Sequence, residues 1–271
     1  MKYDLKDISF LIHLRVDIPE RLQNLKLVLE YYNSTCKNLE FIIVNDDKEP
    51  EPELSVLNKK YKFIKFLFLK NSSIYKRTLS FNKAFTHTKR RVVIAGDTDV
   101  IIDPKFLLEG ANKIINNEAD HIFPYNGLFC NVKYSLVRKF KTNLDLSTFL
   151  DKKPEPKQRY NNFENGYLTV LSPESKGGCV MYCSKLYKQI NGYNPNFVGW
   201  GYEDDEIGYR VKKFSGRTDR IFNDDAIAWH LPHPNTVRSE HPYYETNHSI
   251  CSYVGEQSLE VLKEYIKTWK M

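Results

Sequence analysis

The sequence predicts an α/β fold in which a mostly parallel sheet is flanked by helices. Short β-rich apolar runs alternate with helical apolar patterns through the first hundred residues, which is typical of parallel strands joined by crossover helices. The chain has 271 residues, of which 41% are hydrophobic and 14% aromatic, so it can bury a substantial core as one large domain or two small ones. We expect a single domain, with ligands bound beyond the carboxyl ends of the strands.

The first strand is expected over residues 8–16, "ISFLIHLRV", and a helix follows in "DIPERLQNLKLVLEYY". Asp17 can cap this helix, and Pro19 suits its first turn. The apolar residues of the helix recur at helical spacing and are Leu22, Leu25, Val28, Leu29 and Tyr32.

Three further strands are expected at 39–47, 61–69 and 91–96, with a helix around 77–87 before the last of them. Asp103 and Pro104 repeat the Asp-Pro pattern of a helix start.

Two later segments have a different character. Residues 141–176 are polar and only weakly periodic, so they form either a lid or binding loop or a plain surface excursion. The segment 257–271 is amphipathic, and docking on the protein's own core is favoured over a partner or membrane surface. Its apolar side comprises Leu259, Leu262, Tyr265, Ile266 and Trp269.

The charge of the chain points to anionic ligands without choosing among them. A net charge of +6 is spread along the sequence, which suits an acidic substrate, a phosphate-bearing ligand or an anionic membrane surface. No RNA- or DNA-binding signature accompanies it, so we expect no nucleic-acid partner. Five cysteines without a CxxC pair indicate a reducing compartment, and no apolar run has the length of a signal peptide or spanning helix. We therefore expect a cytoplasmic protein.

Polar residues follow three of the expected strands. They are Arg15 and Asp17, the run Asn45–Asp47, and the pair Asp97 and Asp99. Because parallel strands end at the same edge of a sheet, these groups are expected to converge there.

The stretch "VVIAGDTDVIIDP" suggests a metal site. Asp97 and Asp99 follow an apolar strand at a spacing that lets them share a hard divalent cation with diphosphate oxygens. His230 and His233 follow the apolar run "AIAW", and imidazole ligands bias a mixed site toward Mn²⁺ over Mg²⁺. The alternative is that these residues bind no metal, the aspartates being ordinary turn residues and the histidines ordinary loop residues beside prolines. Between the two histidines we favour His230, because the strand before it can fix its direction.

Four consecutive acids, Glu203 to Glu206, begin a helical pattern. Ile207, Val211 and Phe214 would form its inward stripe. On this register Glu203 and Asp204 lie at the helix mouth facing inward and are candidates for chemistry, and Asp205 is intermediate. Glu206 is expected on the surface, paired with Arg210 four residues later.

The stretch "GGCVMYCSKLYKQINGYNPNFVGWGYEDDEIGYRV" (177–211) resembles the C-terminal signature of inverting, metal-dependent glycosyltransferases of the GT-A fold. This group includes β-1,4-galactosyltransferases, polypeptide N-acetylgalactosaminyltransferases and bacterial chondroitin-polymerase-type enzymes. The upstream runs "FIIVNDD", "RTLSFNKAF" and "VVIAGDTD" resemble the nucleotide-sugar half of the same fold, so the similarity covers most of 8–235. The matching signature residues are Gly177, Gly178, Asn191, Gly192, Tyr193, Trp200, Gly201, Glu203 and Asp204.

The resemblance implies a role for each matching position. Asp204 would be the catalytic base, and the acceptor would contact Trp200, Gly201, Glu203 and Asp205. The nucleotide-sugar would contact Arg15, Asp46, Asp47, Arg77, Asn82, Asp97, Asp99 and Gly178. The cofactor would be Mn²⁺, with Mg²⁺ as the alternative, held by Asp99 as direct ligand together with Asp97, His230 or His233. Tyr202 departs from the pattern, since a small residue is usual there, and would narrow the acceptor site.

The resemblance also implies a function. A hexosyl or N-acetylhexosaminyl group would pass from a UDP-sugar to a hydroxyl of a glycan or lipid-linked acceptor, with inversion, in bacterial surface polysaccharide synthesis at the inner face of the membrane. Residues 8–103 would bind the nucleotide-sugar, 104–235 would form the acceptor and catalytic half with its polar loop region, and 236–271 a helical extension. Two alternatives stand beside it. A nucleotidyltransferase would want a glycine-rich phosphate loop, which "LRVDIPERL" lacks, and a non-catalytic binding module would be expected to have lost its acids.

Overall fold

The computed structural model of the chain describes residues 2–155, 158, 163–234 and 241–269. Its strands are β1 (Tyr3–Asp4), β2 (Ile8–Leu14), β3 (Cys36–Lys37), β4 (Phe41–Asp47), β5 (Ile64–Lys70), β6 (Val92–Gly96), β7 (Val100–Ile101), β8 (His121–Phe123), β9 (Phe129–Val132), β10 (Leu168–Ser172), β11 (Cys179–Cys183), β12 (Thr218–Arg220) and β13 (Ala228–His230). Its helices are α1 (Pro19–Thr35), α2 (Pro52–Lys60), α3 (Arg77–Phe85), α4 (Pro104–Ile115), α5 (Tyr134–Asn143), α6 (Ser147–Leu150), α7 (Ser184–Gln189), α8 (Glu203–Phe214), α9 (Tyr244–Glu256) and α10 (Leu259–Lys267).

The central sheet of the described chain has seven strands in the order β12-β8-β11-β6-β2-β4-β5. Strands β2, β4, β5 and β6 pair in parallel, as do β8 and β12. Strand β11 runs antiparallel to both of its neighbours, β6 and β8. The predicted mostly parallel α/β sheet is therefore confirmed, with one reversed strand, β11, inserted between β8 and β6.

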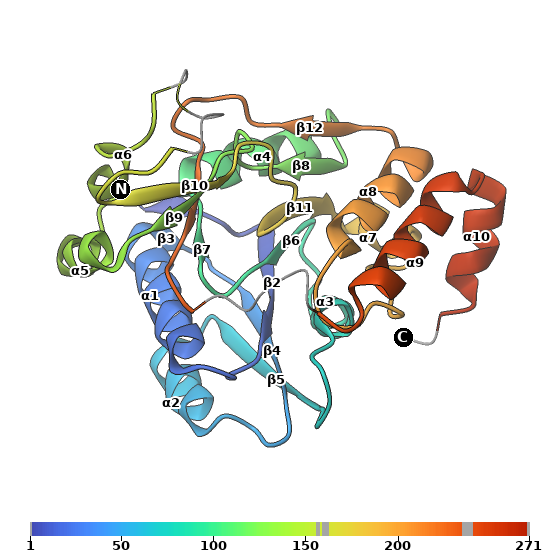
Figure 1. Ribbon diagram of the computed structural model, residues 1–271, viewed down its shortest axis with the longest axis horizontal. Helices are drawn as coiled ribbons and strands as arrows, with labels where there is room; N and C mark the ends of the chain where they lie inside the picture. The colour runs from blue at the N-terminus through green and yellow to red at the C-terminus, as the bar shows by residue number, and fades with distance from the viewer. Residues whose placement is uncertain (1, 156–157, 159–162, 235–240, 270–271) are drawn as a thin grey trace.

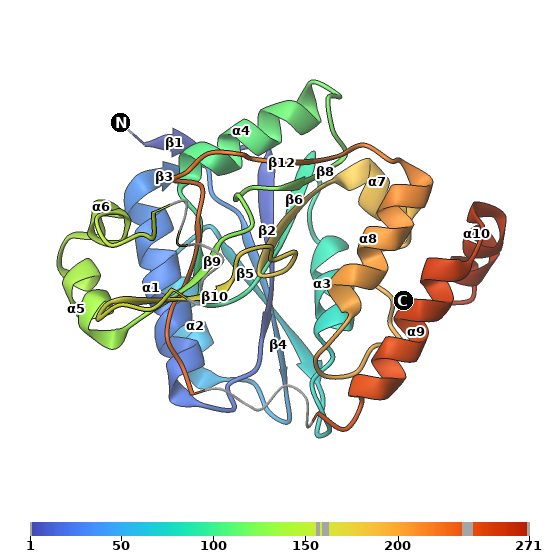
Figure 2. The ribbon, with the colours of Figure 1, turned by 45° about the horizontal axis from the view of Figure 1, so that its top comes forward.

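Apolar side chains project from both faces of this sheet, because successive residues of a strand point in opposite directions. Phe10, Ile43 and Ile94 belong to the core under α1, α2 and α4, whereas Leu11, Val44 and Val93 belong to the core under α3, α7 and α8. Figures 1 and 2 show these two helix groups on opposite sides of the sheet. Burial on both faces explains why the strands read as continuous apolar runs.

A second, four-stranded sheet in the order β10-β9-β13-β7 lies beside the first. Its strand β13 pairs antiparallel with β7 and parallel with β9, which places His230 opposite both Val100 and Asn131. This small sheet joins the segment after β6 to the C-terminal part of the fold, and so brings His230 to the position next to Asp99.

Two helix starts test the Asp-Pro pattern. Asp103 caps α4, since its side chain accepts a hydrogen bond from the backbone N–H of Lys105, as predicted. The prediction for Asp17 is wrong: the N-cap of α1 is Ile18, without a side-chain cap. Asp17 instead accepts a 3.3 Å hydrogen bond from Nε of Arg21.

The segment 141–176 is more regular than expected. It contains the end of α5, the short helix α6 and strand β10, which pairs with β9. Part of the segment (156–157 and 159–162) lies outside the described residues.

Helix α8 begins at Glu203, and Ile207 and Val211 are buried as predicted. The expected surface position of Glu206 is wrong. Glu206 and Arg210 are both fully buried, and Oε2 of Glu206 lies 2.7 Å from Nη2 of Arg210. Helices α9 and α10 lie against the outside of α8, so a face that would otherwise be solvated is covered (Figure 2).

The C-terminal helix α10 docks on the protein's own core, as favoured by the sequence, since Leu262 and Ile266 are buried. Across the described ranges, every helix is too short or too polar to cross a bilayer.

Candidate active site

Two adjoining cavities at the carboxyl ends of β2 and β6 share four lining residues: Arg77, Asp97, Phe129 and Trp200. We call the first the histidine lobe; it is also lined by His13, Arg15, Asp17, Arg21, Tyr75, Thr98, Asp99, His230, His233 and His241. We call the second the glycine lobe; it is also lined by Leu171, Ser172, Ser175, Lys176, Gly177, Gly178, Gly201, Tyr202, Glu203, Asp204, Asp205 and Tyr244.

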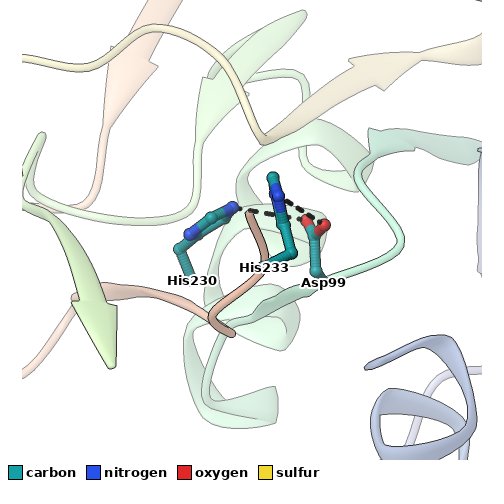
Figure 3. A group of neighbouring side chains, drawn as sticks. All are labelled: Asp99, His230 and His233. Carbon is teal, nitrogen blue, oxygen red and sulfur yellow. Dashed lines mark ion pairs between the residues drawn. The ribbon is translucent and has the colours of Figure 1, made fainter. Parts of the chain in front are cut away.

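The histidine lobe contains a group that could hold a metal ion. One ligand atom from each of Asp99, His230 and His233 lies within 4.8 Å of the others (Figure 3). Nε2 of His230 lies 3.7 Å from Oδ1 of Asp99, and Nε2 of His233 lies 3.4 Å from Oδ2. The geometry therefore brings both histidines to Asp99, whereas the sequence ranked His230 ahead of His233.

The other nitrogen of each ring is held by an oxygen acceptor. Nδ1 of His230 lies 3.0 Å from Oδ1 of Asn131, and Nδ1 of His233 lies 2.9 Å from the carbonyl oxygen of Pro234. Since these oxygens accept hydrogen bonds, each neutral ring carries its proton on Nδ1 and presents the lone pair of Nε2 toward Asp99. A carboxylate and two oriented imidazoles form a donor set that could hold a divalent metal ion, and imidazole ligands favour a transition metal over Mg²⁺.

Asp97 does not join this group. Its Oδ1 lies 2.8 Å from Nη2 of Arg77, and its carboxylate borders both lobes. Burial raises the pKa of Asp97, and the Arg77 charge opposes that rise. The two aspartates of the Asp-x-Asp pattern thus have different partners.

Arg77, at the first turn of α3, links the two lobes. Its Nη1 donates a 2.8 Å hydrogen bond to Oε1 of Glu203 and lies 3.7 Å from Oδ2 of Asp204. Burial acts to lower the pKa of Arg77, but Asp97, Asp204 and Glu203 together raise it well above its ordinary value, so the guanidinium stays charged. Both oxygens of Glu203 are engaged, because Oε2 accepts from the backbone N–H of Gly201 at 2.9 Å.

Asp204 lies in the glycine lobe, near the positive N-terminal end of α8. Its Oδ1 accepts a 3.2 Å hydrogen bond from the hydroxyl of Tyr193. Burial raises the pKa of Asp204 to about 7; Glu203 and Asp97 act in the same direction, while Arg77 and Tyr193 act against it. A carboxylate with a pKa near the working pH suits general-base catalysis.

The Gly177-Gly178 pair makes room for this carboxylate. A Cβ at Gly177 would lie 2.4 Å from Oδ2 of Asp204. Gly178 has a φ of +78°, and a Cβ there would meet the ring of Phe129 at 2.5 Å. The glycines of the signature are thus explained by the close approach of the backbone to Asp204 and Phe129.

Aromatic side chains form one wall of the glycine lobe. The rings of Trp200 and Tyr244 stack with centroids 5.9 Å apart and planes at 10°. The hydroxyl of Tyr202, the residue that departs from the family pattern, donates a 3.0 Å hydrogen bond to that of Tyr244. At the rim, Oδ1 of Asp205 lies 2.9 Å from Nζ of Lys176, with both side chains substantially exposed. Such a wall fits the apolar face of a sugar ring with polar groups at its edge.

Three predicted donor contacts lie outside both lobes. Asn82 is buried against the signature loop, where its side chain bonds the backbone N–H and carbonyl of Tyr193. Asp46 is fully buried and accepts a 2.6 Å hydrogen bond from the backbone N–H of Lys76. Asp47 accepts from the backbone N–H of Lys48. Arg15, by contrast, lines the histidine lobe, and its buried Nη1 has no hydrogen-bond partner within the described structure.

Several residues that line the two lobes could not be predicted as site residues from the sequence. Arg21 lies 3.3 Å from Oδ2 of Asp99, although it reads as one exposed position of an amphipathic helix. Phe129 and Tyr244 come from segments without a motif, and only the tertiary fold brings them to the cavity.

The sheet order and the two-lobed site at the carboxyl ends of its strands define the class: the chain has the GT-A fold of nucleotide-sugar glycosyltransferases. Residues 157–234 match the family model described as the N-terminal domain of galactosyltransferase. This range contains the Gly-Gly pair, the Trp-Gly-x-Glu-Asp signature and both histidines. A comparison with curated protein sequences found no match.

Two solved structures are similar over nearly the whole chain. Residues 1–349 of S. aureus TarS, in complex with UDP-GlcNAc, match with a TM-score of 0.61 and 13% identity, over 98% of this chain and 70% of that one. The catalytic domain of Drosophila β1,4-galactosyltransferase 7, in complex with xylobiose, matches with a TM-score of 0.50 and 15% identity, over 95% of this chain and 83% of that one.

Proposed function

We propose that this chain transfers a sugar from a UDP-sugar to a hydroxyl group of a saccharide acceptor with inversion. The observation that carries the proposal is the placement of Asp204 and the Asp99, His230 and His233 group in adjoining lobes that share Arg77 and Trp200. A base on one side and an anion-stabilising group on the other are what a single displacement at a sugar carbon requires.

The histidine lobe would receive the nucleotide diphosphate. Arg15, Arg21 and Arg77 supply positive charge along its wall, and the unpartnered Nη1 of Arg15 offers a buried donor. A divalent ion bound at Asp99, His230 and His233 would supply Lewis-acid stabilisation of the departing UDP. The TarS fragment, which shares the fold, was solved with UDP-GlcNAc bound.

The glycine lobe would receive the acceptor. Asp204 would take the proton of the acceptor hydroxyl as its oxygen forms a bond to the anomeric carbon, and the bond from that carbon to the UDP oxygen breaks on the opposite face. Trp200 and Tyr244 would orient the acceptor ring, and Arg77 would keep Glu203 and Asp204 in place.

On this assignment, residues 8–103 supply most of the donor site and 104–235 most of the acceptor side, with 236–271 as a helical extension that contributes Tyr244. A glycan or lipid-linked acceptor of bacterial surface polysaccharide, reached at the inner membrane face, is the part of the proposal supported by the sequence resemblance alone.

The experiment is a donor panel scored for acceptor-stimulated UDP release with Mn²⁺ present. UDP-galactose, UDP-N-acetylgalactosamine, UDP-N-acetylglucosamine and UDP-glucuronate are each tested with a saccharide library, and Asp204→Asn protein is the matched control. Release of UDP with one donor, absent in the control, supports the proposal. Tight binding of a donor without turnover would indicate a binding module, and pyrophosphate release from UTP and a sugar phosphate would indicate a nucleotidyltransferase; either result contradicts the proposal.

A further inference from the structure

We propose that Tyr193 is a positioning residue for Asp204: its hydroxyl occupies Oδ1 and leaves Oδ2 as the atom that receives the acceptor proton. This inference rests on the proposed function for the role of Asp204 as base, but the contact itself can be tested without any activity.

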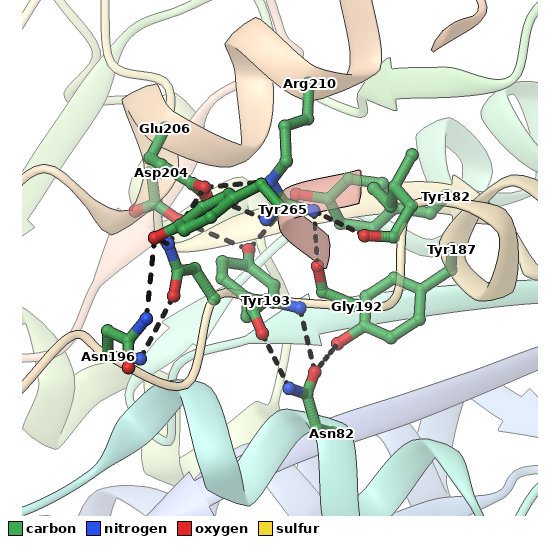
Figure 4. A network of polar contacts seen from close by, with 12 residues as sticks. Asn82, Tyr182, Tyr187, Gly192, Tyr193, Asn196, Asp204, Glu206, Arg210 and Tyr265 are labelled. Carbon is green, nitrogen blue, oxygen red and sulfur yellow. Dashed lines mark hydrogen bonds and ion pairs between the residues drawn. The ribbon is translucent and has the colours of Figure 1, made fainter. Parts of the chain in front are cut away.

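The direction of the hydrogen bonds follows from their donors. The hydroxyl of Tyr193 lies 3.2 Å from Oδ1 of Asp204 and 3.1 Å from the hydroxyl of Tyr182 (Figure 4). An ionised carboxylate can only accept, so Tyr193 donates its single proton to Asp204. Tyr182 must then donate to the oxygen of Tyr193, and this second bond strengthens the first by polarising it.

Tyr193 is held rigidly in this position. Its backbone N–H donates to Oδ1 of Asn82 at 2.8 Å, and its carbonyl accepts from Nδ2 of the same side chain at 2.6 Å. The preceding carbonyl, of Gly192, accepts from Nη1 of Arg210 at 2.8 Å. Asn82 was predicted at the donor, but its contacts make it the residue that anchors Tyr193. The ring of Tyr193 is fully buried, so it cannot swing away from Asp204 without disturbing the core.

Asp204 lines the glycine lobe, and the oxygen of its carboxylate that Tyr193 does not bind is Oδ2. It lies 3.7 Å from Nη1 of Arg77, and the backbone of Gly177 approaches it so closely that no Cβ fits between. Three neighbouring charges act on the carboxylate: Arg77 from α3, Asp97 from the end of β6, and Glu203 from α8 itself. Tyr193 is the neutral donor in this set, and it binds one oxygen only.

The contact has a consequence for pH dependence. A hydrogen bond donated to the ionised form of a carboxyl lowers its pKa, so the Tyr193 bond opposes the rise caused by burial. Removal of the hydroxyl would therefore raise the pKa of Asp204 and leave more of the base protonated at neutral pH.

The test compares Tyr193→Phe with Tyr187→Phe. Tyr187 is a buried tyrosine of the same cluster, and its hydroxyl bonds Oδ1 of Asn82 and does not reach Asp204. In Tyr193→Phe the acid-side midpoint of the kcat profile should move upward by about one pH unit, because a charge-assisted hydrogen bond is lost. In Tyr187→Phe the midpoint should stay in place even if the thermal stability falls. Equal midpoints for wild type and Tyr193→Phe, or equal shifts in both variants, would overturn the proposal.

A titration without substrate separates this proposal from the proposed function. The protein is labelled with ¹³C at aspartate carboxyl carbons, and the Asp204 resonance is assigned by its absence in Asp204→Asn. Its midpoint should rise in Tyr193→Phe, rise less in Tyr182→Phe, and remain unchanged in Tyr187→Phe. If that pattern holds while no donor is turned over, the contact stands and the glycosyltransferase assignment fails. If turnover is found but the titration midpoint of Asp204 is the same in wild type and Tyr193→Phe, only the positioning role fails.

Discussion

Nη1 of Arg77 donates a 2.8 Å hydrogen bond to Oε1 of Glu203, although 126 positions separate the two residues along the chain. The other terminal nitrogen of the same guanidinium lies 2.8 Å from Asp97. One planar side chain from α3 therefore connects the end of strand β6 with the start of helix α8. Its two-pronged geometry is the reason why arginine, and not lysine, suits this position.

Arg77→Lys should lower the transfer rate by about tenfold or more, because an ammonium group cannot bridge both carboxylates and the start of α8 loses its anchor. The measurement is kcat with saturating donor, together with the thermal midpoint. Arg217→Lys is the matched control, since that arginine is half-exposed and pairs with Asp120 at the surface. An Arg77→Lys enzyme as active as the control would show that the bridge has no part in catalysis.

Asp204→Asn should abolish transfer, with a loss on the order of 10²–10⁴ in rate, while UDP affinity stays nearly unchanged. Asp205→Asn should cost much less, because Asp205 is at the rim with Lys176. The wild-type rate should also fall as the pH drops through about 7, since protonated Asp204 cannot accept a proton. Normal turnover in Asp204→Asn together with loss of transfer activity in Asp205→Asn would identify Asp205 as the base.

Gly177→Ala should lower kcat by about 10²-fold while the fold remains intact, because the new Cβ would lie 2.4 Å from Oδ2 of Asp204 and must displace it. Gly208→Ala provides the contrast: it lies in α8, and nothing within 4 Å opposes a Cβ there. That variant should gain about 0.5–1 kcal/mol of stability and keep its activity. Kinetics and urea unfolding of both variants check the pair. An active Gly177→Ala enzyme would mean that the carboxylate does not need its present position.

UDP should bind more weakly in EDTA than in Mn²⁺, because the diphosphate and the site carboxylates otherwise repel each other. His230→Ala and His233→Ala should each raise the Mn²⁺ midpoint by at least tenfold, since both Nε2 atoms face Asp99. Calorimetry with UDP and Mn²⁺ titrations are the measurements, and the exposed His87→Ala is the control. Equal UDP affinity with and without metal would contradict the metal assignment. An unchanged Mn²⁺ midpoint in one histidine variant would show that this histidine is not a ligand.

Glu206→Gln should destabilise the protein by about 3–5 kcal/mol, because it leaves the fully buried guanidinium of Arg210 without its counter-charge. Glu264→Gln, at an exposed pair with Lys267, should change stability by about 1 kcal/mol or less. Chemical unfolding of the two variants measures the difference. Similar values for both would mean that the buried pair is readily replaced.

Local patterns in the sequence were enough to predict strands β2, β4, β5 and β6 and their parallel arrangement. The apolar runs at β2, β4 and β6 are buried on both faces, and a strand buried in this way is nearly continuous in apolar residues, so the sequence shows it directly. The acids at the start of α8 and the glycines at 177 and 178 also lie close together in the chain, so one signature contains them.

Contacts between distant segments were not predictable in this way. Glu206 and Arg210 have the spacing of a surface pair, and their burial depends on α9 and α10 covering that side of α8. Asn82 was predicted to contact the nucleotide-sugar donor. In the structure its side-chain amide instead forms hydrogen bonds with the backbone of Tyr193, because the loop that carries Tyr193 folds over it.

The sequence by itself determined the fold class, the Asp-x-Asp, the base candidate and both histidines, because each of these is encoded by residues near one another in the chain. The tertiary structure decided which of them meet. Strand β13 pairs with β7, and His230 and His233 therefore lie next to Asp99. Asp97 lies outside that group and pairs with Arg77, which also binds Glu203. The physical reason is that register and side-chain pairing across a sheet depend on the packing of the whole core, which no short stretch of sequence contains.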